Sequence, residues 1–443
     1  MTSPAAGQAI SPPDGARPAL HFTAPSHWLN DPHGLCWAGG EYNLFYQHHP
    51  GGNVWSADIV WGHATSADLV RWRHQPIALR PEPAERGCWS GAVLVEDDRP
   101  TILYTSVAGE DWDIGRVAVA RPDVTLRHWA SARSPDVEVL IEGPPESLGA
   151  IAFRDPCLVR TADGWALVIG VGVASGAGLV VQWVSADSVT WTYDGVVCSR
   201  PGDADDVWTG SMWECPQLFR LEGDTWALVV SVWDAGRLNY NAVAVGTYNG
   251  HRFVAERWSR LTHDENAYAM TSFQDRDGQP AVMFWLREDA DHAPDAQAWS
   301  GALSLPMVAE LTADRQVRLA PHRDVDTLRH GGVHPTDDAA WPLDGGGLDL
   351  LVLSTGGVVV VTVGGVEVIR LRVAPAAVTV HRPQRPDSVV PVADPTVRII
   401  VDTGIVVIHG GLGCGTVRYD AVGPAEVTVH AVGATVQRLA AAG

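Results

Sequence analysis

The stretch Trp28-Leu-Asn-Asp-Pro-His-Gly-Leu-Cys-Trp-Ala-Gly-Gly-Glu-Tyr-Asn-Leu-Phe-Tyr46 sets a pattern that recurs along most of this chain. Polar residues beside an aromatic residue open it, a short apolar run follows, and a Gly-Gly pair leads into a second apolar run. Two apolar runs joined by a short glycine turn are typical of a β-hairpin. We therefore expect a hairpin over residues 28–46.

The same pattern returns four more times, over residues 89–104, 153–169, 213–230 and 268–285. Its reference positions are Asp31, Ser90, Asp155, Glu214 and Tyr268. Successive positions are separated by 59, 65, 59 and 54 residues. Repeats of this length indicate propeller blades with extended loops. The sequence predicts an all-β fold that begins with a five-bladed β-propeller over residues 21–308.

The pattern changes in the last third of the chain. Tryptophan nearly disappears after Trp299, and valine-rich runs separated by Gly, Pro and Asp take over, for example over residues 358–363, 366–373 and 397–401. Such runs predict a C-terminal β-sandwich over residues 309–443. Residues 1–20, rich in Pro, Gly and Ala, are expected to form a flexible tail.

Charge and composition exclude several classes of partner. The 31 basic and 52 acidic residues give a net charge of −21, which repels nucleic acid and anionic membranes. No run of apolar residues is long enough to span a membrane, and the N-terminus lacks the apolar stretch of a secretory signal, so a cytoplasmic location is expected. The six cysteines form no C-x-x-C pair, so neither a metal site nor a disulfide framework is predicted. Oligomeric state has no signal in the sequence.

Three carboxylates stand in the first, third and fourth repeats. Corresponding strand ends of all blades point toward the propeller axis, so Asp31, Asp155 and Glu214 are expected to share one pocket. Cleavage of a glycosidic bond needs a carboxylate on one side of the sugar ring and a carboxylic acid on the other. We expect Asp31 in a tight Asp-Pro-His-Gly turn, Glu214 in an apolar surround, and Asp155 beside Arg154 as an acceptor for sugar hydroxyls.

These blocks resemble glycoside hydrolase family 32, which contains invertases, inulinases, levanases and fructosyltransferases. Trp28–Gly34 is similar to that family's W-M-N-D-P-N-G motif, and three further blocks look like its F-S-G, R-D-P and E-C-P blocks, namely those that start at Trp89, Phe153 and Trp213. The resemblance implies a retaining double displacement that removes terminal β-D-fructofuranosyl residues from sucrose or short fructo-oligosaccharides, a small-molecule carbohydrate. It implies no metal and no cofactor.

The resemblance also assigns roles. Asp31 would be the nucleophile, Glu214 the acid/base, and Asp155 the stabiliser of the transition state through fructosyl hydroxyls. The fructosyl subsite would be lined by Asn30, Gln47, Trp55, Trp89, Ser90, Arg154 and Tyr268. The chain departs from the family pattern at His33, Cys157, Gln217 and Met307, where asparagine, lysine, aspartate and arginine are common, and these positions bear on substrate specificity.

Three alternatives remain open. A fructosyltransferase of the same fold shares the covalent intermediate and differs in whether water or a sugar accepts the fructosyl group. An inverting five-bladed glycosidase of the arabinanase and xylosidase group would also use three carboxylates. A non-catalytic sugar-binding propeller would keep the pocket without turnover.

Overall fold

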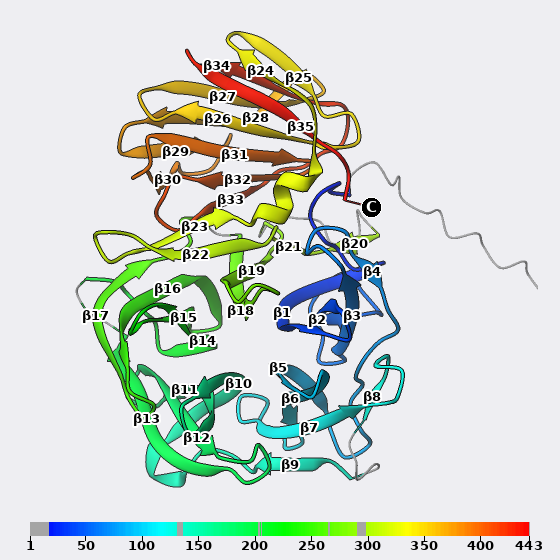
Figure 1. The fold of residues 1–443 in the computed structure, drawn as a ribbon, viewed down its shortest axis with the longest axis vertical. Helices are drawn as coiled ribbons and strands as arrows, with labels where there is room; N and C mark the ends of the chain where they lie inside the picture. Colours follow the sequence, from blue (N-terminus) through cyan, green and yellow to red (C-terminus); the bar gives the residue numbers. More distant parts are fainter. Residues whose placement is uncertain are drawn as a thin grey trace, which may run out of the picture.

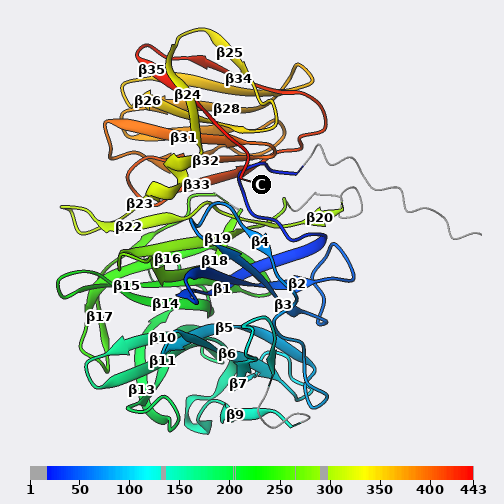
Figure 2. The same ribbon diagram turned by 45° about the vertical axis from the view of Figure 1, so that its right-hand side comes forward.

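The structure is a computed structural model that describes residues 17–130, 136–202, 204, 206–264, 266–289 and 298–442. Two all-β bodies are stacked, a ring of five sheets and a two-layered sandwich above it (Figure 1). Turning the molecule brings the edge of the ring forward and keeps the sandwich packed on one side of it (Figure 2). The predicted fold, a five-bladed propeller followed by a sandwich, is confirmed.

Four blades follow the order of the chain. Their strands are β1 (His27–Ala38), β2 (Glu41–His49), β3 (Val60–Ser66) and β4 (Arg73–His74); β5 (Gly87–Glu96), β6 (Arg99–Val107), β7 (Arg116–Pro122), β8 (Trp129–Ala130) and β9 (Glu138–Ile141); β10 (Ala150–Thr161), β11 (Gly164–Val173), β12 (Ala177–Ser185) and β13 (Thr192–Pro201); and β14 (Met212–Glu222), β15 (Thr225–Asp234), β16 (Arg237–Tyr248) and β17 (Phe253–Arg260). Apolar side chains from facing sheets fill the space between blades, as Leu103 of β6 and Leu167 of β11 do. Burial of this apolar surface stabilises the ring.

The fifth blade extends further than the sequence predicts. It contains β18 (Ala267–Gln274), β19 (Pro280–Leu286), β21 (Ala302–Leu303), β22 (Met307–Leu311) and β23 (Val317–Pro321). The predicted boundary at residue 308 therefore falls inside β22, and the propeller ends at Pro321. The loss of tryptophan misplaced the boundary because the outer strands of this blade contain none. β20 (Trp299–Ser300) pairs in parallel with β1 and joins the last blade to the first.

The sandwich consists of two six-stranded sheets. One contains β24 (Arg329–Thr336), β26 (Gly347–Leu353), β31 (Thr396–Asp402), β32 (Ile405–His409), β33 (Gly415–Arg418) and β35 (Ala434–Leu439). The other contains β25 (Ala339–Pro342), β27 (Gly357–Val363), β28 (Val366–Ala374), β29 (Ala377–His381), β30 (Ser388–Pro391) and β34 (Ala425–His430). In β26, Leu348, Leu350 and Val352 are buried while Leu351 and Leu353 are exposed, the alternation that one buried sheet face requires. Within the described ranges, two short 3-10 helices, Glu146–Leu148 and Arg323–Leu328, lie in connections.

The N-terminal segment is anchored before the predicted propeller start. Most of the expected tail, residues 1–16, lies outside the described residues, but residues 17–20 are packed. The Asp402 carboxylate accepts hydrogen bonds from the backbone N–H groups of Ala19 (2.8 Å) and Leu20 (2.9 Å), and Leu20 is buried. The expectation of a flexible tail is therefore wrong for residues 17–20, because a buried acid from the sandwich satisfies their backbone.

None of the helices in the described ranges is long and apolar enough to cross a bilayer.

Candidate active site

A β-bulge interrupts the inner strand of every blade at the same level. The ladder shifts between Leu29 and Pro32 in β1, and the corresponding shifts lie at Trp89/Gly91, Arg154/Cys157, Glu214/Gln217 and Tyr268/Thr271. A bulge re-aims the side chains around it. Asp31 therefore lies in a bulged strand and not in the tight turn that the sequence predicted, and the bulge directs its carboxylate into the pocket.

The register of the strand ladders shows that the reference residues of the repeats are not all at equivalent positions. Glu214 precedes its bulge, as Arg154 does, whereas Asp155 and Cys215 lie inside theirs with positive φ angles of 63° and 44°. The two residues that precede a bulge contact each other, since Arg154 Nη2 donates to Glu214 Oε1 at 2.9 Å. The two residues inside a bulge do the same, since Cys215 N donates to Asp155 Oδ2 at 3.0 Å. Glu214 is thus offset by one position from Asp155.

The bulges surround a cavity of about 510 Å³. It is lined by nine residues that the sequence predicted: Asn30, Asp31, Gln47, Trp55, Trp89, Arg154, Asp155, Glu214 and Tyr268. Ser90, the tenth, reaches the same site through hydrogen bonds to Asp31 and Gln47. The structure therefore brings together every predicted site residue, while their chemical roles stay predictions.

Several lining residues were missed. They are Trp28, Trp112, Asp113, Trp233, Gly236, Leu238 and Trp285. Trp28 opens the first block and Trp285 ends the fifth hairpin, so both had a signal in the repeats. Trp112 and Asp113 lie between β6 and β7, in a connection that has no counterpart in the repeat pattern.

Two short hydrogen bonds hold Asp31, besides a longer contact of 3.5 Å from Cys215 Sγ to its Oδ2. Ser90 Oγ donates to its Oδ2 at 2.7 Å, and Asn30 Nδ2 donates to its Oδ1 at 3.1 Å. Withdrawal from water raises the pKa of Asp31 to about 6; the bond from Ser90 acts in the opposite direction, and the charge of Glu214 raises it further. Asp31 is therefore ionised at neutral pH and becomes protonated in mild acid.

A chain of side-chain hydrogen bonds fixes those donors. Trp28 Nε1 donates to Asn30 Oδ1 (3.0 Å), Asn30 Nδ2 donates to Gln47 Oε1 (2.8 Å), and Gln47 Nε2 donates to Ser90 Oγ (2.5 Å). Because each amide is oriented by its neighbour, Asn30 and Ser90 are pre-organised to face Asp31.

Asp155 lies deeper. Its backbone N–H donates to Thr105 Oγ1 at 2.9 Å, and its carboxylate accepts from Cys215. Burial raises the pKa of Asp155 to about 7, the guanidinium of Arg154 lowers it, and the charges of Glu214 and Asp31 raise it. The charges of Glu214 and Asp31 therefore act on Asp155, whose carboxyl group can hold a proton near neutral pH.

Glu214 has polar and charged neighbours. Besides Arg154, the hydroxyl of Tyr268 donates to Oε2 of Glu214 at 2.6 Å. The expected apolar surround is wrong, because neighbouring residues on a strand point to opposite sides and Trp213 faces away, with its ring 5.3 Å from that of Trp258. The donors to Glu214 come from the adjacent blades, which local sequence does not reveal.

Tryptophans form one wall of the cavity. Trp89 lies 6.1 Å from Trp55 and is stacked on Trp112 at 5.9 Å with an interplanar angle of 15°. Trp55 is 52% exposed at the rim. Aromatic walls combined with convergent acceptors and donors suit a polyhydroxylated ring that has apolar C–H faces. Among the described residues, no group of three or more His, Cys, Asp or Glu side chains could hold a metal ion.

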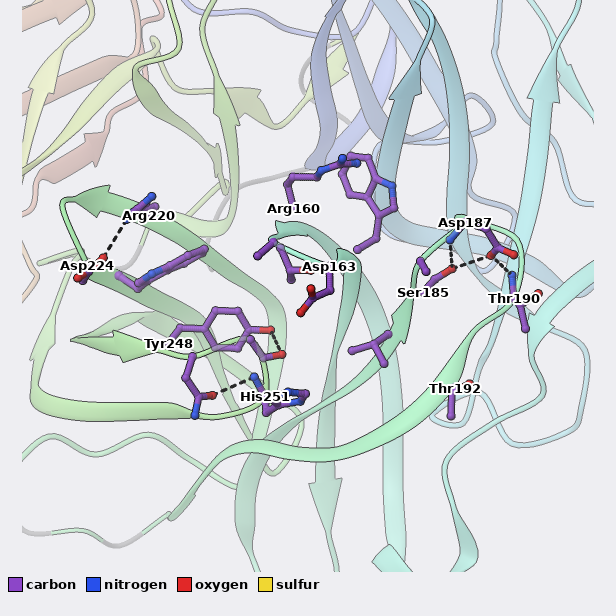
Figure 3. Close-up of a pocket in the computed structure, with 18 residues that line it drawn as sticks. Arg160, Asp163, Ser185, Asp187, Thr190, Thr192, Arg220, Asp224, Tyr248 and His251 are labelled. Carbon is purple, nitrogen blue, oxygen red and sulfur yellow. Dashed lines mark hydrogen bonds and ion pairs between the residues drawn. The ribbon is translucent and has the colours of Figure 1, made fainter.

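A larger hollow of about 900 Å³ lies beside Arg160 and Arg220, at the ends of β10 and β14 that are farther from the bulges (Figure 3). Its charged groups serve local contacts: Arg160 covers the ring of Trp165 at 4.5 Å, and Arg220 pairs with Asp224 at 3.0 Å. Asp187 accepts from the backbone of Thr190 in the turn that follows β12 (2.8 Å). The pocket at the bulges is therefore the stronger candidate.

Comparison with known proteins identifies similar chains. A family model described as "Glycosyl hydrolases family 32 N-terminal domain" matches residues 21–321, and so ends at the last residue of β23. A fructan 6-exohydrolase of Beta vulgaris is 32% identical over 363 residues, which cover 74% of this chain and 57% of that protein. A sucrose-6-phosphate hydrolase of Escherichia coli is 31% identical over 338 residues, which cover 72% of this chain and 67% of that protein.

Solved structures share the fold. A GH32 β-fructofuranosidase of Bombyx mori superposes with a TM-score of 0.83 at 24% identity, covering 97% of this chain and 95% of that one. A sucrose-6-phosphate hydrolase of Lactobacillus gasseri gives 0.80 at 22% identity, covering 97% and 93%. The first curated relative is longer, since the chain matches little more than half of its length.

Proposed function

Since the chain belongs to glycosyl hydrolase family 32, we propose that it is a retaining β-fructofuranosidase that hydrolyses terminal β-D-fructofuranosyl residues of sucrose or short fructo-oligosaccharides. The convergence of Asp31, Asp155 and Glu214 from three blades into one pocket carries the proposal. The similarity to a fructan 6-exohydrolase and to a sucrose-6-phosphate hydrolase supports a fructoside as the substrate.

The reaction proceeds in two displacements. The carboxylate of Asp31 attacks the anomeric carbon of the fructosyl unit, the bond to the leaving oxygen breaks, and Glu214 donates its proton to that oxygen. Glu214 then removes a proton from water, which attacks the same carbon, releases fructose and regenerates Asp31. Configuration is retained because the carbon is inverted twice.

The other residues position the sugar. The carboxylate of Asp155 accepts hydrogen bonds from fructosyl hydroxyls, while Arg154 and Tyr268 orient Glu214 through the bonds at Oε1 and Oε2. The amides of Asn30 and Gln47 and the hydroxyl of Ser90 supply further polar contacts, and the wall that contains Trp55 and Trp89 packs against the apolar face of the sugar.

Kinetics with sucrose, kestose, inulin and levan test the proposal. Fructose should be released from sucrose or kestose, and proton NMR should show retention in the first-formed anomer. Asp31→Asn and Glu214→Gln should each lower turnover by on the order of 10²- to 10⁴-fold, whereas Asp224→Asn, a change at an exposed acid, should not. Absence of fructose release from all four substrates would refute the proposal.

A sugar acceptor in place of water would make the enzyme a fructosyltransferase. The covalent intermediate is common to both, so product analysis at high sucrose concentration separates them: free fructose supports hydrolysis, and lengthening oligosaccharides support transfer. A reducing compartment is proposed as the location, in keeping with six cysteines that are all free.

A further inference from the structure

One wall of the pocket is built by a connection that the repeats do not explain. Residues 108–115 join β6 to β7, whereas the corresponding connections are three residues long between β11 and β12 and two residues long between β15 and β16. The first blade has a long connection as well, residues 50–59, which carries Trp55. Among the first four blades, the long connections that line the pocket therefore belong to the first and the second.

The wall at residues 108–115 is firmly attached. Phe153 N donates to Asp113 O (2.8 Å) and Gly115 N donates to Phe153 O (2.9 Å), so the connection pairs with the chain directly before Arg154. Arg86 lies 4.2 Å from the ring centroid of Trp112 and donates from Nη1 to Gly109 O at 3.0 Å. With Trp112 stacked on Trp89, the position of Asp113 is fixed from two sides.

Asp113 presents a carboxylate to the mouth of the pocket. Its Oδ1 accepts from Arg154 Nη1 at 3.2 Å, while the other nitrogens of Arg154 bind Glu214. The side chain of Asp113 is 58% exposed, against 16% for Glu214. Within the described part of the chain, its Oδ2 accepts no hydrogen bond, so this oxygen can accept one from a ligand.

The charge balance of the pocket is negative and disfavours an anionic ligand. Its lining contains four carboxylates, on Asp31, Asp113, Asp155 and Glu214, and among the described lining residues Arg154 is the one cation. All three nitrogens of Arg154 already bind carboxylates. A phosphorylated leaving group would therefore meet negative charge without a cation to pair with.

We infer that Asp113 is a specificity-determining residue, which accepts hydrogen bonds from hydroxyls of the leaving sugar and disfavours an anionic leaving group. This inference rests on the proposed function. It places a neutral sugar, such as the glucosyl unit of sucrose, beside Asp113 at the mouth of the pocket, next to the fructosyl unit over Asp31.

Three substrates distinguish recognition of the leaving sugar by Asp113 from support of Arg154. They are sucrose, sucrose 6-phosphate, and methyl β-D-fructofuranoside, whose methanol leaving group is too small to reach Asp113. Asp113→Asn should raise KM for sucrose roughly tenfold with a much smaller change in kcat, because a charged hydrogen-bond acceptor is lost. Its loss of kcat/KM on sucrose should exceed that on the methyl fructoside by roughly the same factor. The ratio of kcat/KM for sucrose 6-phosphate to that for sucrose should rise tenfold or more.

Glu110→Gln is the matched control, since it removes the same charge from an exposed position of the same connection and should alter none of these ratios. Equal losses of Asp113→Asn on sucrose and on the methyl fructoside would overturn the inference and leave Asp113 only as a support for Arg154. A wild-type preference for sucrose 6-phosphate would also overturn it. Wild-type protein that releases fructose from none of the three substrates would instead refute the proposed function.

Discussion

Ser90 donates a 2.7 Å hydrogen bond to Oδ2 of Asp31, although 59 residues separate the two in the chain. The bond crosses from the bulge of β5 to the bulge of β1, so two blades must be correctly packed before it forms. It favours the ionised form of Asp31, against the withdrawal from water that raises the pKa to about 6. The packing of two blades thus sets the protonation of the proposed nucleophile.

Ser90→Ala tests this relationship. Loss of the donor removes an interaction with the ionised form, so the pKa of Asp31 should rise above about 6. The acidic limb of the kcat/KM profile, which reports the free enzyme, should move to higher pH by about one unit, the worth of one hydrogen bond. Ser188→Ala, which changes a hydroxyl bonded to Glu96 far from the pocket, serves as control. An unmoved limb, or one displaced to lower pH, would contradict the assignment of Asp31.

Asp31→Asn should make the folded protein more stable above neutral pH. A carboxyl group whose pKa rises from 3.8 to about 6 on folding binds more protons in the folded state, so stability falls as pH rises through that window. The asparagine is neutral throughout and avoids up to about 3 kcal/mol of this cost at pH 8.

Thermal unfolding at pH 4 and pH 8 measures the effect. The gain in melting temperature of Asp31→Asn over wild type should be larger at pH 8 than at pH 4. Asp224→Asn, at a side chain that is 98% exposed, should show the same small difference at both values. A gain that is equal at both pH values would show that Asp31 does not titrate with a raised pKa.

Asp402 ties the N-terminal segment to the sandwich. Its fully buried carboxylate accepts from the backbone N–H groups of Ala19, Leu20 and His21 and from His21 Nδ1. Asp402→Ala leaves these groups buried and unsatisfied, so we expect a loss of at least about 3 kcal/mol. Asp402→Asn should lose less, because it retains one acceptor oxygen. Urea unfolding checks both against Asp420→Ala, an exposed acid in the same domain; equal midpoints for all three variants would exclude the anchoring role.

The parts of the site that the sequence predicted have a common physical origin. Asp31, Ser90, Asp155, Glu214 and Tyr268 follow the repeat, and a propeller brings corresponding strand ends to one axis whatever the loops do. The one-position offset of Glu214 from Asp155 could not be predicted. It results from the bulges, which change the side to which neighbouring residues point and leave no periodicity in the sequence. The place of Asp113 in the pocket could not be predicted either. It results from pairing between its connection and the segment before Arg154, a contact between separate blades that local sequence does not encode.

His33, where family 32 members often have asparagine, gives the last prediction. Its ring lies 3.8 Å from that of Trp61, it is 3% exposed, and neither ring nitrogen has a hydrogen-bond partner among the described residues. Burial lowers the pKa of His33 to about 3. The unfolded chain therefore binds a proton that the folded chain rejects between about pH 6.5 and 3, and stability falls by about 3 kcal/mol between pH 7 and pH 4.

His33→Phe should keep the ring contact with Trp61 and remove this acid sensitivity. The variant should match or exceed wild-type stability at pH 7, because two unsatisfied buried nitrogens are replaced by carbon. Its advantage should then grow as pH falls to 4, as measured by urea unfolding at both values. His330→Gln, at an exposed histidine, should follow wild type. A constant difference between His33→Phe and wild type across this range would mean that His33 takes up a proton in the folded state, which requires a partner or water access at its ring.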